Sequence, residues 1–347
     1  MTPADLSRTV VRAVRCAVED GELGAGAVVP ERIVVERTRP GGVGEYATPV
    51  ALRLAKASGR APAEVAGLLA RRLGGVAGIR HVDITGPGFL NFTLDAPGDA
   101  DDVVRSVRAR GSAYGFAERP RAGAAPATDR EPRARAVREA VGRLRAAQGM
   151  PDEPGPRRVV PPARADGDVV RRFGADAARW GMLATDPAGP PHFGPVLLVQ
   201  GEANEFFRVR YAASRARALV RNAAQLGFDP AEPSEPAEPT DLTDPSVPAP
   251  HPEADADTSV DAAALLGALR EYPLVLEAAA HHRAPERLAR HLVVLADALL
   301  DFQYDVLPKG DEKPSAAHRS RLALADAAGT VLAGGLTLLG IGAPDVV

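Results

Sequence analysis

The stretch EFFRVRYAASRARALVRNAAQLGF, residues 205–228, decides the fold class of the C-terminal half of the chain. Its apolar and small residues recur every three to four positions, which is typical of an amphipathic helix. Tyr211 and Arg215 are four residues apart and share one face of that helix, with Arg208 one turn earlier. We therefore expect a long helix with one buried side and arginines on its outer side.

Helical spacing continues on both sides of this stretch. Residues 166–204 lead into it, and residues 260–347 contain three further long helical patterns. Between them, residues 229–258 hold eight prolines and nine acidic residues without any Lys or Arg, a composition that cannot bury a core. We predict an all-α antiparallel bundle over residues 166–347, with an acidic Pro-rich loop at 229–258.

The N-terminal third combines helices with strands. Helical spacing at 4–20, 48–58, 61–74 and 99–110 surrounds a short strand at 31–37 and two alternating segments, IRHVDITG and GFLNFTLD, that Gly86-Pro87-Gly88 joins as a hairpin. Residues 1–118 are therefore predicted to form one α+β domain. Residues 119–165 are rich in Pro, Ala and Arg and are predicted to be a linker, with one weak helical pattern at 134–148. The chain as a whole is expected to be mostly α.

Composition excludes several classes of protein. The chain has 347 residues and one cysteine, Cys16, so a disulfide within the chain and a Cys-based zinc site are impossible. We expect no metal centre at His281, His282 and His291, because adjacent histidines on a helix point apart. No signal peptide and no run of about 18 apolar residues is present, so we expect a cytoplasmic chain without a membrane span. We expect neither a metal nor a cofactor.

The charge balance is compatible with a nucleic-acid partner. Nine of the 45 acidic residues and none of the 42 basic residues lie in 229–258, which leaves the rest of the chain at +6. A mildly basic body with one acidic loop is compatible with nucleic-acid binding, but a charged face is more often only a solvated one. Asp297, Asp301 and Asp305 follow one another at intervals of four and predict a solvated stripe.

Several motifs, in a fixed order, resemble arginyl-tRNA synthetases. EYATPVALRLAKASGRAPAEVAGLLARRL followed by GPGFLNFTL is similar to the N-terminal additional domain of that family. GADAARWGMLATDP, ANEFFRVRYAASRARALVR and RLALADAAGTVLAGGLTLLGIGAPDVV are similar to the entry, first long helix and C-terminal helix of its DALR anticodon-binding domain. The resemblance covers both ends of the chain and implies tRNA, either arginine-accepting or a related one, as the partner.

The catalytic domain that the resemblance implies between these ends does not match. A class I synthetase places a His-x-Gly-His signature at a helix N-terminus and uses a Lys-Met-Ser-Lys-Ser loop to stabilise the reacting phosphates. Residues 119–165 contain neither His nor Lys, HFGP at 192–195 lacks the second His, and KGDEKPS at 309–315 lies within the predicted bundle. We expect no catalytic residues and interpret residues 119–165 as the replacement of a lost catalytic domain.

The resemblance also implies two sets of tRNA contacts. Those on the anticodon side are Arg208, Tyr211, Arg215, Arg217, His318 and Arg319. Those on the D-loop side are Phe89 and Asn91. Alternation along the strand places both on the face opposite the apolar Leu90, Phe92 and Leu94, and therefore predicts that they are exposed. For each set the simpler interpretation, an Arg-rich solvated helix and a plain hairpin, stays open.

These observations favour a catalytically inactive arginyl-tRNA synthetase paralogue that binds tRNA in a regulatory or accessory role. A second interpretation is a protein-interaction scaffold that reuses the same domains and binds a protein partner. A third interpretation is that a ligase name given to this chain would be inherited from the two resembling domains alone. Domain identity without the catalytic site does not establish activity.

Overall fold

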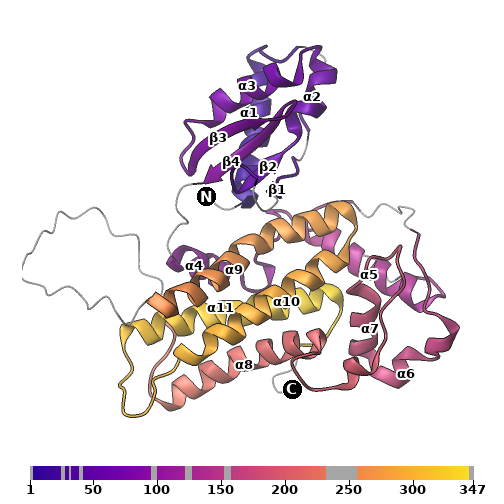
Figure 1. Ribbon diagram of the computed structural model, residues 1–347, viewed down its shortest axis with the longest axis vertical. Helices are drawn as coiled ribbons and strands as arrows, with labels where there is room; N and C mark the ends of the chain where they lie inside the picture. Colours follow the sequence, from indigo (N-terminus) through magenta and orange to yellow (C-terminus); the bar gives the residue numbers. More distant parts are fainter. Residues whose placement is uncertain are drawn as a thin grey trace, which may run out of the picture. The chain divides into compact units, whose positions relative to one another are not determined.

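The computed structural model describes residues 3–24, 28–30, 33–38, 42–94, 100–121, 127–151, 158–231 and 256–343. The chain divides into two compact units, Met1–Asp99 and Ala100–Val347. The first unit contains a small sheet with helices and the second is all helical (Figure 1), which confirms the predicted fold class. Each unit is described by itself below.

Among its described residues, the N-terminal unit contains three helices and a four-stranded antiparallel sheet in the order β1-β2-β4-β3. The strands are β1 (Glu36–Arg37), β2 (Tyr46–Thr48), β3 (Ile79–Thr85) and β4 (Phe89–Leu94). The helices are α1 (Pro3–Glu19), α2 (Val50–Ser58) and α3 (Pro62–Leu73). The predicted hairpin and helices are present. Of the strand predicted over 31–37, residues 33–37 are described, and of these only Glu36 and Arg37 pair with β2.

The core of this unit lies between the sheet and the helices. Leu90 and Phe92 of β4 are fully buried, as are Leu6 of α1 and Leu69 of α3. Thr48 donates its hydroxyl to the carbonyl of Val34 (2.8 Å) and does not cap α2, whose N-cap is Pro49. Thr48 therefore ends β2 and ties it to the preceding segment, although the sequence predicts it as part of the helix at 48–58.

The second unit is built from helices. In chain order these are α4 (Ala100–Arg110), η1 (Gly111–Ala113), α5 (Pro132–Ala147), η2 (Arg164–Asp166), α6 (Val169–Phe173), α7 (Ala175–Leu183), η3 (Pro195–Leu198), α8 (Glu205–Gln225), α9 (Ala256–His282), α10 (Pro285–Phe302), η4 (Gln303–Asp305) and α11 (Ala316–Leu339). Most of the predicted acidic loop, residues 232–255, lies outside the described residues.

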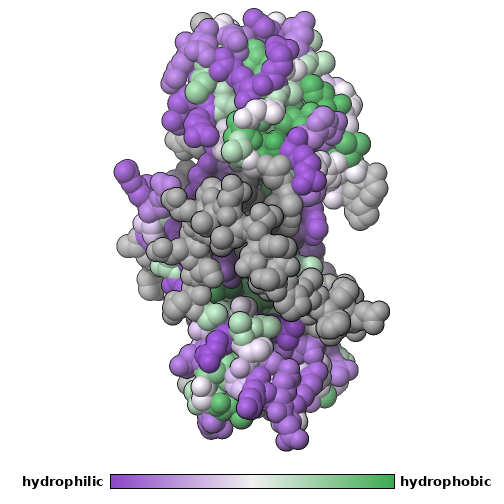
Figure 2. Space-filling model, turned by 90° about the vertical axis from the view of Figure 1, so that its left-hand side faces the viewer, coloured by the Kyte–Doolittle hydropathy of each residue, from purple (hydrophilic) through white to green (hydrophobic). Residues whose placement is uncertain are grey.

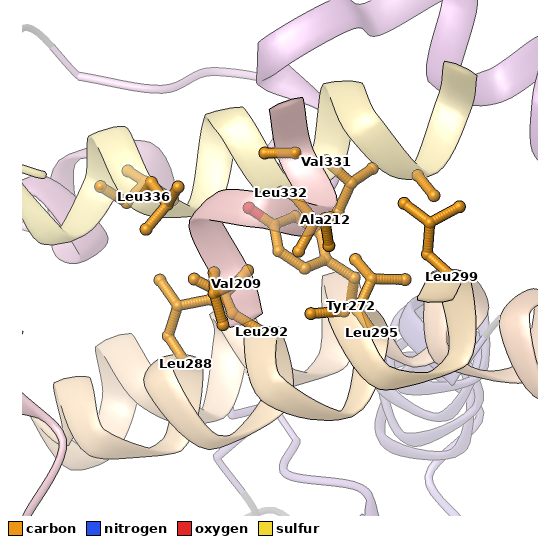
Figure 3. Close-up of a cluster of buried hydrophobic side chains, with 14 of the residues drawn as sticks. Val209, Ala212, Tyr272, Leu288, Leu292, Leu295, Leu299, Val331, Leu332 and Leu336 are labelled. Carbon is orange, nitrogen blue, oxygen red and sulfur yellow. The ribbon is translucent and has the colours of Figure 1, made fainter. Parts of the chain in front are cut away.

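Four long helices form the bundle core. Aliphatic residues of α8, α10 and α11 surround the ring of Tyr272 from α9 (Figure 3). Glycines allow the closest approaches: a Cβ on Gly329 of α11 would lie 2.5 Å from Ala216 of α8, and one on Gly335 would lie 2.5 Å from Leu292 of α10. Larger residues at these positions would push the helices apart.

Two helices before residue 166, α4 and α5, pack into the bundle core, which the sequence does not predict. Val103, Val104 and Val107 of α4 join the same buried cluster as the bundle helices, so α4 lies in the second unit and not in a domain ending at 118. Ala140 and Leu144 of α5 are fully buried there too. The region predicted as a linker, 119–165, therefore contains a helix that completes the bundle core.

Helix α11 is long and apolar enough to cross a membrane by length and composition alone, contrary to our expectation from apolar runs. Its most apolar window is 78% buried against the other helices, which is the behaviour of a core helix in a bundle. Within the described ranges, no group of three or more His, Cys, Asp or Glu side chains is placed to hold a metal ion.

Candidate nucleic-acid interface

Helix α8 presents an aromatic pair near its N-terminus. Asn204 caps the helix, since its side chain accepts from Phe207 N–H (3.3 Å) and donates to the carbonyl of Val199 (2.9 Å). One turn further on, the rings of Phe207 and Tyr211 stack with centroids 5.6 Å apart and an interplanar angle of 15°. Tyr211 is 39% exposed. An outward aromatic surface of this kind can stack on an unpaired base.

Arg208 does not point freely into solvent. Its guanidinium makes a two-pronged ion pair with Asp297 of α10, with Nε 2.8 Å and Nη2 3.2 Å from the two carboxylate oxygens. A third nitrogen donates to the carbonyl of Glu202. Geometry of this kind occupies the donors that would bind a phosphate. Asp297 is thus a partner of Arg208 and not the purely solvated residue that its spacing predicts.

The next two arginines of α8 are also held within the unit. Arg215 donates from Nε to the side-chain oxygen of Gln303 (2.7 Å), which fixes it against the end of α10. Arg217 donates to the carbonyl of Ala343 (3.0 Å), which follows α11 on a different side of the helix. The structure therefore gathers Arg208, Tyr211 and Arg215 on one face of α8 and places Arg217 apart from them.

His318 is a structural residue in this fold. It is 3% exposed and stands at the third position of α11, where its Nδ1 lies 2.7 Å from the hydroxyl of Ser315, the N-cap. Its other ring nitrogen lies 3.5 Å from a carboxylate oxygen of Glu312. The prediction that His318 is available to tRNA is wrong, because the capping interaction buries the ring.

Arg319 is exposed but remote from the aromatic pair. Its guanidinium carbon lies 5.8 Å from the ring centre of Phe228, just beyond the C-terminal end of α8. At 1.5 Å per residue, the helix between Tyr211 and Gln225 alone is about 20 Å long. Arg319 and Tyr211 therefore do not form one small site.

The hairpin of the N-terminal unit separates the two predicted D-loop contacts. Phe89 is 38% exposed at the start of β4, as predicted. Asn91 is only 4% exposed, and its amide donates to the hydroxyl of Thr85 (2.7 Å) and the carbonyl of Phe89 (3.4 Å). The expected exposure of Asn91 is wrong because β4 is an inner strand, with neighbours on both sides. Asn91 instead holds the turn that presents Phe89.

The N-terminal unit also contains an apolar pocket of about 230 Å³ between the start of α2 and the segments before β1. Phe89 and Asn91 are not among its lining residues. Figure 2 shows a hydrophobic area on this unit, in the upper part of the view, among hydrophilic surroundings. The pocket is therefore a separate feature from the hairpin.

Sequence reasoning missed Phe207, the second half of the aromatic pair. The signal was present, because Phe207 and Tyr211 are four residues apart and such pairs meet on a helix face. It was overlooked because the arginines dominate the stretch. Phe207 and Tyr211 form the candidate site on α8, and Phe89 is a separate candidate on the N-terminal unit.

These features define a protein with a small α+β domain and an all-helical bundle in one chain. Residues 7–94 match the model of the arginyl tRNA synthetase N terminal domain, and residues 209–347 match that of the DALR anticodon binding domain. The second match begins within α8 and includes Tyr211. The chain thus carries arginyl-tRNA synthetase-related domains at both ends.

Similar proteins support this assignment over part of the chain. Proteins named arginine–tRNA ligase from Frankia alni and Kineococcus radiotolerans are 52% and 50% identical over 122 and 121 residues, which is 35% of this chain in each case. These matches span about a fifth of the relatives' own length (21% and 22%). The structure of Thermus thermophilus arginyl-tRNA synthetase shares the fold, with a TM-score of 0.58, 14% identity and full coverage of both chains.

Proposed function

We propose that this protein binds tRNA through its two synthetase-related domains and does not activate or transfer an amino acid itself. The observation that carries the binding proposal is the stacked Phe207–Tyr211 pair, in which the half-buried Phe207 supports the exposed ring of Tyr211 on the helix where the anticodon-binding match begins. Exposed aromatic rings beside a basic body are the usual means of holding unpaired bases. Arginine-accepting tRNA is the first candidate because both domain matches point to that synthetase.

The proposed lack of catalysis rests on the contacts that residues of the two partial catalytic motifs, HFGP and KGDEKPS, make in the fold. Within HFGP, Phe193 stacks on Phe173 with ring centroids 5.7 Å apart, and the following η3 spans only four residues. Within KGDEKPS, Lys309 pairs with Asp305 (2.7 Å) and Ser315 caps α11. Each motif serves local packing or capping, which leaves no preorganised cation for ATP phosphates at either place.

Binding is tested by filter titration of the whole chain with arginine-accepting tRNA and an unrelated tRNA at two salt concentrations. We expect tighter binding of the arginine-accepting tRNA, with an affinity that falls as salt rises. Tyr211→Ala should weaken binding about tenfold through the lost stacking. Tyr304→Ala is the matched control, because Tyr304 is a 70% exposed tyrosine that belongs to η4 and not to α8. Equal loss in both variants would contradict the role given to the aromatic pair.

Catalysis is tested separately by arginine-dependent exchange of pyrophosphate into ATP and by charging of tRNA. We expect neither reaction above the rate without protein. Detectable charging by the pure chain would overturn the proposal of inactivity and leave the binding proposal untouched. If no tRNA binds at either salt concentration, the alternative of a protein-interaction scaffold takes its place.

A further inference from the structure

Strand β3 forms an open edge of the N-terminal sheet. It pairs with β4 on one side, and the sheet order β1-β2-β4-β3 leaves its other side without a strand among the described residues (Figure 1). At seven residues it is the longest strand of the sheet, and Ile84 on it is 42% exposed. An edge strand of this length is a template for pairing with a further strand.

The main-chain groups at Val82 point to this open side. Glu45 N–H donates to the carbonyl of Phe92 (2.7 Å), so the polar groups of Phe92 face β2. Val82 lies directly opposite Phe92 in the antiparallel register. In such a pair both residues direct N–H and C=O away from each other, which turns those of Val82 outward. Ile84, two residues on, repeats this orientation.

The sequence of β3 is complementary to itself. The pairing of β3 with β4 is regular from His81 to Thr85, with a register shift between Ile79 and His81. If two copies of this regular part pair antiparallel about Val82, His81 of each lies opposite Asp83 of the other. The two Val82 residues form the hydrogen-bonded pair, so the His81–Asp83 pairs are non-hydrogen-bonded, where side chains approach most closely. Both side chains lie on one face of the strand, since they already pair within the chain (His81 Nε2 to Asp83 Oδ1, 3.1 Å).

We propose that β3 is a self-association edge at which a second copy of this chain adds its own β3 to continue the sheet. The occupant is a second copy because the outward main-chain groups, the central Val82 and the two cross-strand His81–Asp83 pairs all fit one two-fold axis. Two seven-residue strands bury less surface than a stable dimer needs. The association is therefore weak and depends on concentration.

Sedimentation of the whole chain over a range of concentrations tests the proposal. The weight-average mass should rise above the 36.2 kDa of one chain as concentration increases. His81→Asp places carboxylates opposite one another at both symmetric positions and should weaken the dimer about tenfold. The double variant His81→Asp/Asp83→His restores the complementary pairs and should recover most of the association.

Two further variants separate the edge from general effects. Arg60→Gln changes the net charge by the same amount on an exposed part of the same unit and should leave association unchanged. Val82→Pro removes an outward N–H that β4 does not use, and should abolish association while the circular dichroism spectrum is retained. A mass that stays at one chain at every concentration overturns the proposal. So does a dimer that none of the β3 variants affects.

Discussion

Arg133 shows how a single residue can anchor a segment that the sequence presents as a linker. Its side chain is fully buried in the second unit. It donates to the carbonyls of Met182, Val160, Gly189 and Asp186 and to the hydroxyl of Thr185, at distances from 2.6 to 3.1 Å. All five donors of the guanidinium are thereby used. α5 is tied through this residue to the loop that follows α7.

Arg133→Met should destabilise the second unit by about 3–5 kcal/mol, because it leaves several buried carbonyls without a donor. Arg133→Lys should recover only part of the loss, since an ammonium group cannot reproduce the planar arrangement of donors. Urea unfolding followed by the fluorescence of Trp180, the one tryptophan in the chain, measures both. Arg135→Met, two residues further along α5 at an exposed position, is the control, and an equal effect of both variants would contradict this account.

The buried His291 should make the free energy of unfolding depend on pH. Burial lowers its pKa from 6.5 to about 4, although its Nε2 lies 2.9 Å from the carbonyl of Ala268. Because the folded pKa is depressed, the contribution to stability is complete above the unfolded pKa and is lost as pH falls below about 6.5. Between pH 7 and pH 5 the free energy of unfolding should fall by about 2 kcal/mol from this group.

Urea unfolding at pH 7, 6 and 5 measures that slope. His291→Gln should flatten it, whatever its effect on stability at pH 7, because the titrating group is gone. His81→Gln is the control, since the side chain of His81 is 65% exposed. A slope that persists unchanged in His291→Gln would show that other groups produce it.

At the residue scale, the sequence predicts whether a side chain is exposed better than it predicts which groups the side chain contacts. Alternation correctly predicts that Phe89 is exposed and Phe92 buried, because period-2 faces follow from the strand alone. It fails for Asn91, whose burial depends on strands β2 and β3 on either side. His318 fails for a similar reason, since its burial follows from a cap three residues earlier. The tRNA contacts of Tyr211 and Phe89 stay predictions.

Between elements, the pairing of α8 with α10 changes how the arginines of α8 act. The Arg208–Asp297 ion pair joins the two helices, and Asp297 is 45% exposed, so we expect little net stability from it. Its main effect is to engage the guanidinium of Arg208, which lies on the same face of α8 as Tyr211. This effect on the proposed tRNA binding cannot be predicted from a sequence in which the two residues are 89 positions apart.

Asp297→Asn should therefore tighten tRNA binding, because it releases Arg208 while removing a negative charge. We expect about a threefold gain at low salt and a steeper fall of affinity with rising salt. Asp301→Asn removes the same charge one turn further along α10 and is the matched control, with a smaller gain expected. Filter titration at two salt concentrations measures both variants. Equal gains would mean that Arg208 does not reach RNA when it is released.

The existence of the helices was easier to predict than their docking. Apolar spacing identifies residues 99–110 and 134–148 as helical, close to α4 and α5 as observed. It does not reveal which core receives their apolar faces, because Val103 and Leu144 pack against helices more than a hundred residues away in sequence. Composition misled for residues 119–165, since Pro- and Arg-rich flanks mask a helix whose small apolar side is enough to fill the bundle.

At the scale of the whole molecule, the division at Asp99 implies that the two units fold independently. Fragment 100–347 retains every described element of the second unit and should unfold cooperatively in urea. Fragment 119–347, cut at the boundary that the sequence suggests, lacks Val103, Val104, Val107 and Tyr114, all of which are buried in the bundle core. Losing their burial should cost roughly 5 kcal/mol or more, which is comparable with the whole stability of a domain.

Urea unfolding of both fragments, again followed by Trp180, decides between the two boundaries. Fragment 100–347 should match the transition that Trp180 reports in the whole chain, and fragment 119–347 should show a transition at much lower urea or none. Adding a peptide of residues 100–118 should raise that midpoint, because α4 and Tyr114 would return to the core. Equal stability of the two fragments would mean that α4 covers the bundle without stabilising it, and that the α+β domain includes this helix after all.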